Sequence, residues 1–258
     1  MQFIILHLMP LFALLTSVET IDWIVCGTYY VAGMFFITAG YHRYFSHRAF
    51  KLNRFWQFIF ALMAQATAQR GVLWWASHHR FHHRYSDTEK DVHSKKRRGF
   101  WYSHIGWMIL ADQKEDFNRV KDLAKYPELV WLNKYHFLVP TLLGVCMLLI
   151  GGPSMLFIGF FFTLVLLWNC TWTINSLSHM FGNQRYKTGD ESKNNWILAI
   201  LTLGEGWHNN HHHYMHSGRQ GFFWYEIDLT YYVLKILSWF RVVRDLRPVP
   251  DKFKYGIA

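Results

Sequence analysis

The distribution of basic residues constrains the fold of this 258-residue chain more than any other feature of its sequence. All 27 lysines and arginines lie in two segments, residues 43–134 and 185–258, and none stands outside them. Integral membrane proteins carry Lys and Arg beside the cytoplasmic ends of their spans and almost none within the spans. A soluble protein with very apolar core helices rarely separates charge so completely. We therefore predict an integral membrane protein.

Four apolar segments approach the length of a membrane span: residues 3–18, 21–41, 136–150 and 155–174. A spanning helix needs about 17–25 residues, so the first and the third segments depend on their flanks. Short connectors without Lys or Arg join the segments in pairs, at Glu19-Thr20 and at Gly151-Gly152-Pro153. The predicted fold is an all-α membrane protein in which four spans form two hairpins.

The positive-inside rule places both basic segments and both termini in the cytoplasm. We expect the two segments to form a helical cap, and because no repeat or linker divides the chain, residues 1–258 are treated as one domain. The stretches Phe55–Ala68 and Phe222–Phe240 are too short or too charged to span, and suit helices at the membrane interface. The N-terminus lacks a basic n-region and a small-residue cleavage site, so no cleavable signal peptide is expected.

The formal net charge of +10 raises the question of a nucleic-acid partner. Basic residues beside membrane spans more often serve topology and contact with anionic lipid. Membrane lipid is therefore an expected partner and nucleic acid is not. The three cysteines, Cys26, Cys146 and Cys170, stand alone in apolar stretches, so neither a disulfide framework nor a cysteine metal site is predicted.

Histidine is unusually frequent, with sixteen residues, and the densest stretch is GEGWHNNHHHYMH at residues 204–216. His208, His211 and His212 in this stretch have the spacing HxxHH, and the earlier stretch WASHHRFHHRYSD repeats that spacing. Residues at i, i+3 and i+4 share one face of a helix. Each triplet is thus predicted to direct three ring nitrogens to one point.

Two further histidine groups follow membrane spans. His42 and His47 follow the second span, and His179 follows the fourth. A separation of five residues is a poor match for one face of a continuous helix. We therefore expect either that the helix ends between His42 and His47 or that these two residues serve different sites. All of these groups lie on the predicted cytoplasmic side.

Together the groups supply nine imidazoles with few carboxylates nearby: His42, His47, His79, His82, His83, His179, His208, His211 and His212. Nine are too many for one metal ion but suit two, and imidazole binds iron, zinc, copper and nickel. The pattern indicates a dinuclear centre able to activate oxygen. The remaining imidazoles of the basic segments are expected to be supporting or structural, with His213 an alternative ligand to a neighbour: His78, His93, His104, His213 and His216.

In this order, HRYFSH, HHRFHH and GEGWHNNHH resemble the three histidine boxes of the integral-membrane fatty-acid desaturases, and are most similar to the acyl-CoA Δ9 (stearoyl-CoA) branch. The resemblance runs from about Gly40 to Asp228 and includes NSLSH. It implies that the nine histidines bind two iron ions and that Asn175 reaches a metal through a water. It also implies that four residues line an acyl tunnel near its bend, although membrane-protein packing accounts for them equally well: Gln69, Trp75, Thr171 and Trp172.

The resemblance further implies an oxidoreductase that introduces a cis double bond, at Δ9, into a long-chain saturated acyl group. An unactivated C–H bond is too strong for a side-chain base, so a metal centre must activate O2 as co-substrate. Two electrons come from the acyl chain and two from an external donor. The chain has no heme, flavin or iron–sulfur motif, so a separate ferredoxin, rubredoxin or cytochrome-b5-type protein is expected. The short form looks bacterial, which implies the inner membrane.

Two departures from the acyl-CoA branch concern the head group of the substrate. Ala111-Asp112, with Lys114 close by, stands where that branch has a basic pair, and Ser77-His78 replaces an Arg-Asp pair. Coenzyme A carries several phosphates and requires Lys or Arg. The basic run Lys95–Arg98 offers a substitute. Acyl-CoA is the first expectation for the carrier, and acyl groups on phospholipid or carrier protein are the alternatives.

Two other functions are compatible with parts of the pattern. A membrane di-iron hydroxylase or ketolase carries similar histidine boxes, although GEGWHNNHH and NSLSH match desaturases better. A metal transporter or sensor without catalysis would need ligands within the bilayer. The predicted spans hold almost no ionisable residues between their ends, which argues against a translocation path.

Overall fold

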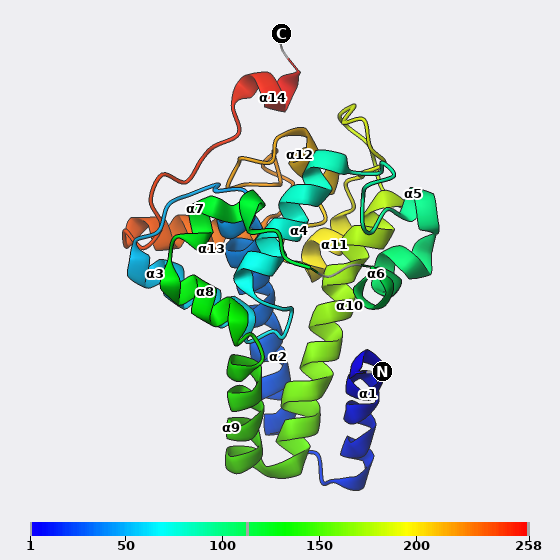
Figure 1. Ribbon diagram of the computed structural model, residues 1–258, viewed down its shortest axis with the longest axis vertical. Coiled ribbons are helices and arrows are strands. Elements are labelled where there is room, and N and C mark those ends of the chain that lie inside the picture. Colours follow the sequence, from blue (N-terminus) through cyan, green and yellow to red (C-terminus); the bar gives the residue numbers. More distant parts are fainter. Residues whose placement is uncertain (1, 112–113, 257–258) are drawn as a thin grey trace.

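The structure is a computed structural model that describes residues 2–111 and 114–256. Over these residues the chain forms helices joined by turns and loops, without a β-strand, as the all-α prediction requires. Figure 1 shows a narrow stem of long helices below a wider head of shorter ones. Asp112, one of the two residues that replace the basic pair, lies outside the described residues.

Helices from both halves of the chain build the stem. These are α1 (Gln2–Leu8) with the 3₁₀ helix η1 (Met9–Leu15), α2 (Thr20–Phe35) with the π-helix η2 (Phe36–Ser46), α9 (Leu138–Ser154), and the π-helix η5 (Met155–Phe162) with α10 (Thr163–Ser176). Two continuous helical stretches, residues 20–46 and 138–179, are long and apolar enough to cross a membrane. Leu14, Leu15 and Ile150 are 84%, 81% and 82% exposed. Apolar surface of this kind fits lipid better than water.

The two turns at the far end of the stem have different local causes. Gly152 has φ +71, a value that favours glycine, and it breaks the helical path inside α9, within Gly151-Gly152-Pro153 and shortly before η5 begins. The other turn occupies residues 16–19, slightly before the expected Glu19-Thr20. There Glu19 caps α2, and its backbone N–H donates to the Asp22 carboxylate at 2.9 Å. The helix therefore starts at Thr20.

The head gathers the remaining helices around the top of α2, η2 and α10 (Figure 1). They are α3 (Arg54–Gln65), α4 (Val72–Tyr85), α5 (Lys95–Arg98), η3 (Tyr102–Gly106), α6 (Trp107–Leu110), η4 (Phe117–Val120), α7 (Lys121–Ala124), α8 (Pro127–Lys134), η6 (Leu177–His179), α11 (Trp196–Leu201), α12 (His208–His213), α13 (Leu229–Trp239) and α14 (Asp251–Tyr255). The largest buried cluster packs Phe45 of η2, Ala64 of α3, Leu73 of α4 and Leu129 of α8 together. This core holds α4 against η2.

The start of α4 is held by one side chain from α8. The Asn133 Oδ1 accepts hydrogen bonds from the backbone N–H groups of Leu73 and Trp74, both at 3.0 Å. These groups have no partner within the first turn of the helix, so the amide oxygen acts as its cap. Gly71 makes the approach possible, because a Cβ there would lie 2.2 Å from Asn133 Oδ1.

The middle of α4 is tied to the end of η2 by Arg80. Its guanidinium donates to the backbone carbonyls of Phe45 and Ser46 at 2.8 and 3.0 Å, and to the Asp122 carboxylate at 2.6 Å. These contacts fix the position of α4 relative to η2 without any contribution from the histidines that the two helices carry.

The apolar stretch near the C-terminus is helical over only part of its length. Whereas the stretch was expected to be helical over Phe222–Phe240, α13 begins at Leu229, since the Asp228 carboxylate accepts from the Tyr231 N–H at 2.9 Å and caps the helix. The same carboxylate pairs with the fully buried Arg43 at 2.9 Å. The residues before Asp228 therefore fold against η2 rather than extend the helix.

Candidate metal centre

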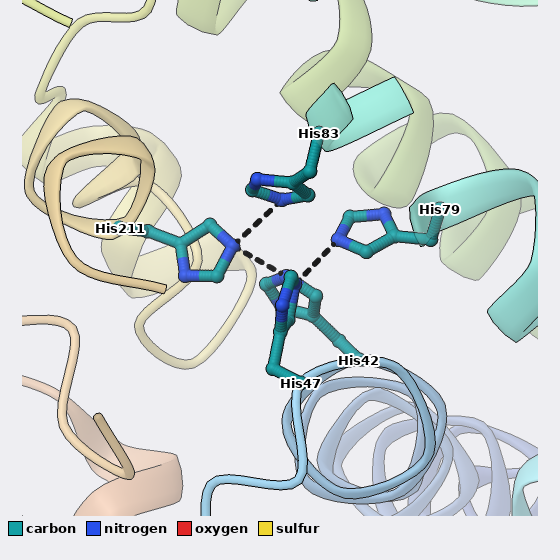
Figure 2. A group of neighbouring side chains, drawn as sticks. All are labelled: His42, His47, His79, His83 and His211. Atoms are coloured by element: carbon teal, nitrogen blue, oxygen red, sulfur yellow. Dashed lines mark hydrogen bonds between the residues drawn. The ribbon is translucent and has the colours of Figure 1, made fainter. Parts of the chain in front are cut away.

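The structure brings all nine histidines of the predicted centre together and divides them into two clusters. The first cluster contains His42, His47, His79, His83 and His211, and the second contains His82, His179, His208 and His212. In each cluster one ring nitrogen per residue lies within 4.8 Å of those of the others. Figure 2 shows the first cluster, in which the rings approach one another from the end of η2, from α4 and from α12.

The π-helix η2 brings His42 and His47 to the same cluster. The His47 N–H donates to the His42 carbonyl at 3.2 Å, a bond that spans five residues. Five residues is the hydrogen-bonding period of a π-helix, so both side chains emerge on one face. Of the two sequence alternatives for this pair, separate sites was wrong, because the two histidines share a cluster. The helix does end between them, but only at Ser46, directly before His47.

The two HxxHH triplets do not each point to one position, and this prediction was also wrong. On α4, His79 and His83 enter the first cluster while His82 enters the second. On α12 the arrangement is reversed, because His208 and His212 enter the second cluster and His211 enters the first. Residues four apart stack on one line of a helix, whereas the residue between them points about 60° aside. Each helix therefore reaches both clusters.

Close approaches between like ring nitrogens characterise the first cluster (Figure 2). The Nε2 atom of His211 lies 2.9 Å from that of His42 and 3.0 Å from that of His83. The Nε2 atoms of His47 and His79 are 2.8 Å apart. A neutral imidazole has only one N–H to donate. When several ring nitrogens face one another, some of their lone pairs therefore point at each other without a proton between them. A cation among them relieves that opposition.

Carboxylates around the second cluster orient its rings. Asp87 lies 3.0 Å from His179 Nδ1, Asp91 lies 3.2 Å from His82 Nδ1, and Asp190 lies 2.6 Å from His212 Nδ1. A carboxylate accepting from Nδ1 fixes the proton there and leaves Nε2 as an electron-pair donor. The Nε2 atom of His212 is buried and has no hydrogen-bond partner within residues 2–111 and 114–256. A buried nitrogen that has a free lone pair and no hydrogen-bond partner is suited to bind a metal ion.

Glu205 serves the first cluster in the same way. Its carboxylate contacts His42 Nδ1 and also accepts from the Arg43 guanidinium at 3.0 Å. The expectation of few carboxylates near the histidines was therefore wrong. The sequence holds two signals for these carboxylates. Glu205 stands inside GEGWHNNHH, and Asp87 and Asp91 follow the HHRFHH box within eight residues.

Burial sets the protonation state of the first cluster. Desolvation lowers the pKa of His79, His83 and His211 well below the usual range, and the neighbouring imidazoles lower it further. In the second cluster, burial lowers the pKa of His212 to about 4 although Asp190 opposes the shift. For His82 burial acts in the same direction, but Asp91, with help from Asp87 and Asp190, outweighs it and raises the pKa. Neutral rings, the form that binds metals, thus dominate near neutral pH.

A small cavity of about 60 Å³ adjoins the first cluster at His79. The four predicted tunnel residues and Asn175 all line it: Gln69, Trp75, Thr171, Trp172 and Asn175. The Gln69 amide donates to the Thr171 hydroxyl at 3.1 Å, which joins the α3–α4 loop to α10 across the cavity. Sequence reasoning missed Trp107 and Met108 of α6, which form another part of the wall.

The remaining histidines have separate positions. His93 is buried and forms a third group with His82 and Asp91, so it adjoins the second cluster. His213 stacks on Tyr186 at 4.0 Å and its Nε2 lies 3.1 Å from the Phe253 carbonyl. Since His213 belongs to neither cluster, the structure does not support it as a substitute ligand. His78, His104 and His216 contact backbone or side-chain oxygens instead: Trp74 O, Ser176 Oγ and His47 O respectively.

Comparison with known proteins agrees with this arrangement. The family model described as fatty acid desaturase matches residues 21–237. The chain is 39% identical over 242 residues to an sn-1 stearoyl-lipid 9-desaturase of Anabaena variabilis, covering 92% of this chain and 88% of that protein. It is 37% identical over 252 residues to an sn-1 stearoyl-lipid 9-desaturase of Synechocystis sp., covering 95% and 78%.

A relative from a plant has a different acyl carrier in its name. The chain is 36% identical over 253 residues to an acyl-CoA C20 Δ5-desaturase of Anemone leveillei, covering 96% of this chain and 80% of that protein. Relatives of similar identity are thus named for lipid-bound and for CoA-bound substrates. The histidine boxes, the paired clusters and these matches together show that the chain belongs to the fatty acid desaturase family.

Proposed function

We propose that this protein is an O2-dependent desaturase that introduces a cis double bond, at Δ9, into a long-chain saturated acyl group. Membership of the desaturase family and two histidine clusters that suit metal ions support the reaction class. One observation carries the proposal furthest: His79, a member of the first cluster, is part of the wall of the cavity beside the clusters. An acyl chain in this cavity would pass next to the metal.

The clusters fit two iron ions, the metal that the family generally uses. In the proposed site the first ion is held by the five histidines of the first cluster, and the second ion by the four of the second cluster, with Asn175 acting through a water. Bound iron would supply the one-electron chemistry with O2 that breaks an unactivated C–H bond. The side chains Asp87, Asp91, Asp190 and Glu205 hold protons on Nδ1 of their histidines and so keep Nε2 available.

The walls of the cavity position the chain and exclude water. Trp75 stacks on His79 with ring centroids 4.8 Å apart, and it shares the cavity wall with Trp107 and Trp172. Rigid aromatic walls limit which methylene stands beside the metal, because they leave little room for the chain to slide. The Gln69–Thr171 hydrogen bond closes the cavity between the α3–α4 loop and α10 and fixes its path there.

We infer a multi-pass topology with four spans in two hairpins and both termini in the cytoplasm, as in a bacterial inner-membrane protein. In Figure 1, α1 begins at the head end of the stem and α14 lies on the far side of the head. No lysine or arginine precedes Arg43, and none lies within residues 135–184, so the helices of the stem carry Arg43 of η2 as their one basic residue. This placement agrees with the positive-inside rule.

The electrons come from a separate redox protein in this proposal. The positive head surface suits an acidic partner such as a ferredoxin, a rubredoxin or a cytochrome-b5-type protein. The acyl carrier was first expected to be coenzyme A, with its phosphates bound by the basic run Lys95–Arg98. The structure weakens that expectation, because three residues of this run already have partners. Lys96 pairs with Glu191 at 3.3 Å, Arg97 pairs with Glu89 at 3.6 Å, and Arg98 donates to Tyr102 at 2.9 Å.

The test is expression of the chain in a bacterial host, with fatty acids compared against an empty-vector control. Double bonds are located by derivatised gas chromatography–mass spectrometry, and metal content is measured on the purified protein. New cis-9 monoenes and about two irons per chain are expected for nine imidazole ligands. If the product is instead a hydroxylated lipid, heavier by one oxygen, the protein is a hydroxylase and the desaturase proposal is wrong.

A further inference from the structure

A second and larger cavity lies in the stem beside the first. It has a volume of about 450 Å³ and lies between α1, α9, η5 and α10. Its walls are apolar, and they include Leu6, Thr141, Gly144, Phe160 and Leu164. Val145 and Phe137, on the same wall, are 45% and 58% exposed, so the cavity is not closed off from the surroundings of the stem. The cavity therefore opens sideways, through the part of the molecule that faces lipid in the proposed topology.

The outer cavity leads towards the metal clusters. Four residues line both the outer cavity and the inner cavity beside His79: Phe3, Ala68, Met108 and Trp168. These residues form a wall that the two spaces share. Movement of that wall would let an extended apolar chain pass from the side of the stem to His79.

Arg70 is the only charged residue among those that line the outer cavity in the described part of the chain. It is half-buried, and its guanidinium lies over the Trp74 ring at 5.5 Å. Its backbone is held by the Tyr41 hydroxyl, which donates to the Arg70 carbonyl at 2.8 Å. The adjacent residue Gln69 lines the inner cavity. Arg70 thus marks the junction between the opening and the path to the clusters.

The charge of Arg70 is uncompensated within residues 2–111 and 114–256, where no carboxylate lies within 4.0 Å of its guanidinium. Glu115 acts on it only from a distance, and the Glu115 carboxylate accepts from Asn133 at 2.8 Å. Other half-buried arginines of the head are paired, such as Arg80 with Asp122 and Arg185 with Glu226. A half-buried guanidinium beside an apolar opening fits an anionic oxygen group attached to an apolar chain.

We propose that the outer cavity is a lateral port through which an acyl chain of a membrane glycerophospholipid enters the active site, with Arg70 binding the phosphate of its head group at the rim. The proposal rests on the desaturase function and names the carrier for that reaction. Coenzyme A esters are soluble and approach from the head, whereas this opening faces the bilayer. A phospholipid presents one phosphate at the level where its acyl chains begin, which matches one arginine above an apolar cavity.

The test uses the full chain in nanodiscs of phosphatidylglycerol, with a trace of phosphatidylglycerol that carries a photoactivatable diazirine on its stearoyl chain. Labelled peptides are mapped by mass spectrometry. Labels are expected in residues 141–145 and 160–168 and at Met108. Excess unlabelled phosphatidylglycerol is expected to reduce labelling, and excess stearoyl-CoA is not.

Matched variants separate the port from general lipid contact. Arg70→Gln is expected to reduce labelling at Met108 about tenfold, since it removes a charge-assisted hydrogen-bond pair. Lys134→Gln removes an exposed charge at the end of α8 outside the cavity and is expected to have no effect. Thr141→Trp fills the cavity and is expected to abolish labelling at Met108. Leu149→Trp, on the 78% exposed side of the same helix, is its control.

A pulse of labelled stearate in the expressing host distinguishes the port from the reaction. Monoenes appearing first in phospholipid support the port. Monoenes appearing first in acyl-CoA, or Met108 labelling that resists both Arg70→Gln and Thr141→Trp in iron-loaded protein, would overturn the port and leave the desaturase function intact. If iron-loaded protein makes no double bond, the desaturase function fails, and the labelling result still decides the port because it needs no turnover.

Discussion

At the scale of single residues, the carboxylates behind the histidines matter as much as the histidines. Asp87 lies 3.0 Å from His179 Nδ1 and also accepts from the Ser94 hydroxyl at 2.8 Å and from the Glu191 N–H at 2.9 Å. Such a carboxylate fixes both the orientation of the ring and the position of its proton. The second cluster therefore depends on residues that are not themselves members of it.

Replacement of Asp190 by Asn tests this dependence. Asp190 lies 2.6 Å from His212 Nδ1, and an amide in its place cannot stabilise the same tautomer as strongly. Loss of such a supporting carboxylate typically costs about 10–100-fold in metal affinity or activity. Asp190→Asn is expected to lower iron content and monoene yield, measured by metal analysis and fatty-acid profiling.

The control for this change is Asp245→Asn, which alters an exposed carboxylate paired with Lys51 on the surface. It is expected to leave iron content and product unchanged. Full iron occupancy in Asp190→Asn, with normal product, would show that His212 needs no support from this side chain.

The lowered histidine pKa values predict how the metal-free protein responds to acid. In the unfolded chain, a histidine ring has a pKa of about 6.5. In the folded chain, burial lowers the pKa of His79, His83 and His211, so these rings stay neutral to lower pH. Below about pH 6.5 the unfolded state thus binds more protons, and the free energy of unfolding falls as pH falls. His82 has a raised pKa and opposes this trend, but it is one group against these three.

The measurement is the thermal midpoint of chelator-treated protein between pH 7.5 and pH 5. It is expected to decrease steadily, and the double variant His79→Gln with His83→Gln is expected to show a smaller decrease. A midpoint that rises on acidification in the unmodified chain would contradict the assigned pKa directions.

At the scale of elements, the position of α4 decides whether its three histidines reach their clusters. The helix is capped by Asn133 and passes so close that residue 71 has no room for a side chain beyond hydrogen. A Cβ at Gly71 would lie 2.2 Å from Asn133 Oδ1 and 2.7 Å from Asn133 Cα. Part of that contact is with backbone, which cannot rotate away.

Gly71→Ala is therefore expected to destabilise the protein by about 1–3 kcal/mol, as overpacking does, and to lower iron content. Gly27→Ala is the matched control, because nothing lies within 4 Å of a Cβ there. Both proteins are compared by thermal unfolding in detergent and by metal analysis. Equal behaviour of the two variants would show that α4 tolerates a shift.

Elements also show which features were predictable from the sequence. The HxxHH spacing predicts helices that carry His79 and His208, and α4 and α12 are such helices. The sharing of each triplet between two clusters depends on where α4 and α12 meet, which local spacing does not encode. The π-helical pitch of η2 and the approach of Asp190 to His212 likewise arise from tertiary contacts. The nine histidines were therefore recognisable, whereas their division and their supporting carboxylates were not.

At the scale of the whole molecule, the stem and the head differ in charge as well as in shape. The helices of the stem carry no lysine and one arginine, Arg43 of η2, whereas all other lysines and arginines lie outside those helices. Residues 16–19 and Gly152 form the two turns at the end of the stem farthest from the head. In the proposed topology both turns face the periplasm.

Reporter insertions test this orientation. Alkaline phosphatase inserted at residues 16–19 is expected to be active, since it folds only when exported, and green fluorescent protein fused after residue 256 is expected to fluoresce. An inactive phosphatase at the first turn, in a chain that still binds iron, would require a different arrangement of the stem.

Because each of α4 and α12 contributes to both clusters, the two metal ions of the proposed site would share two of the helices that hold them. Binding of the first ion would fix the rotation of both helices and so preorganise the ligands of the second. Metal uptake would then be cooperative, and chains holding one ion should be scarce compared with empty or fully loaded chains. In the proposed site, the interleaved histidines would make metal loading all-or-none.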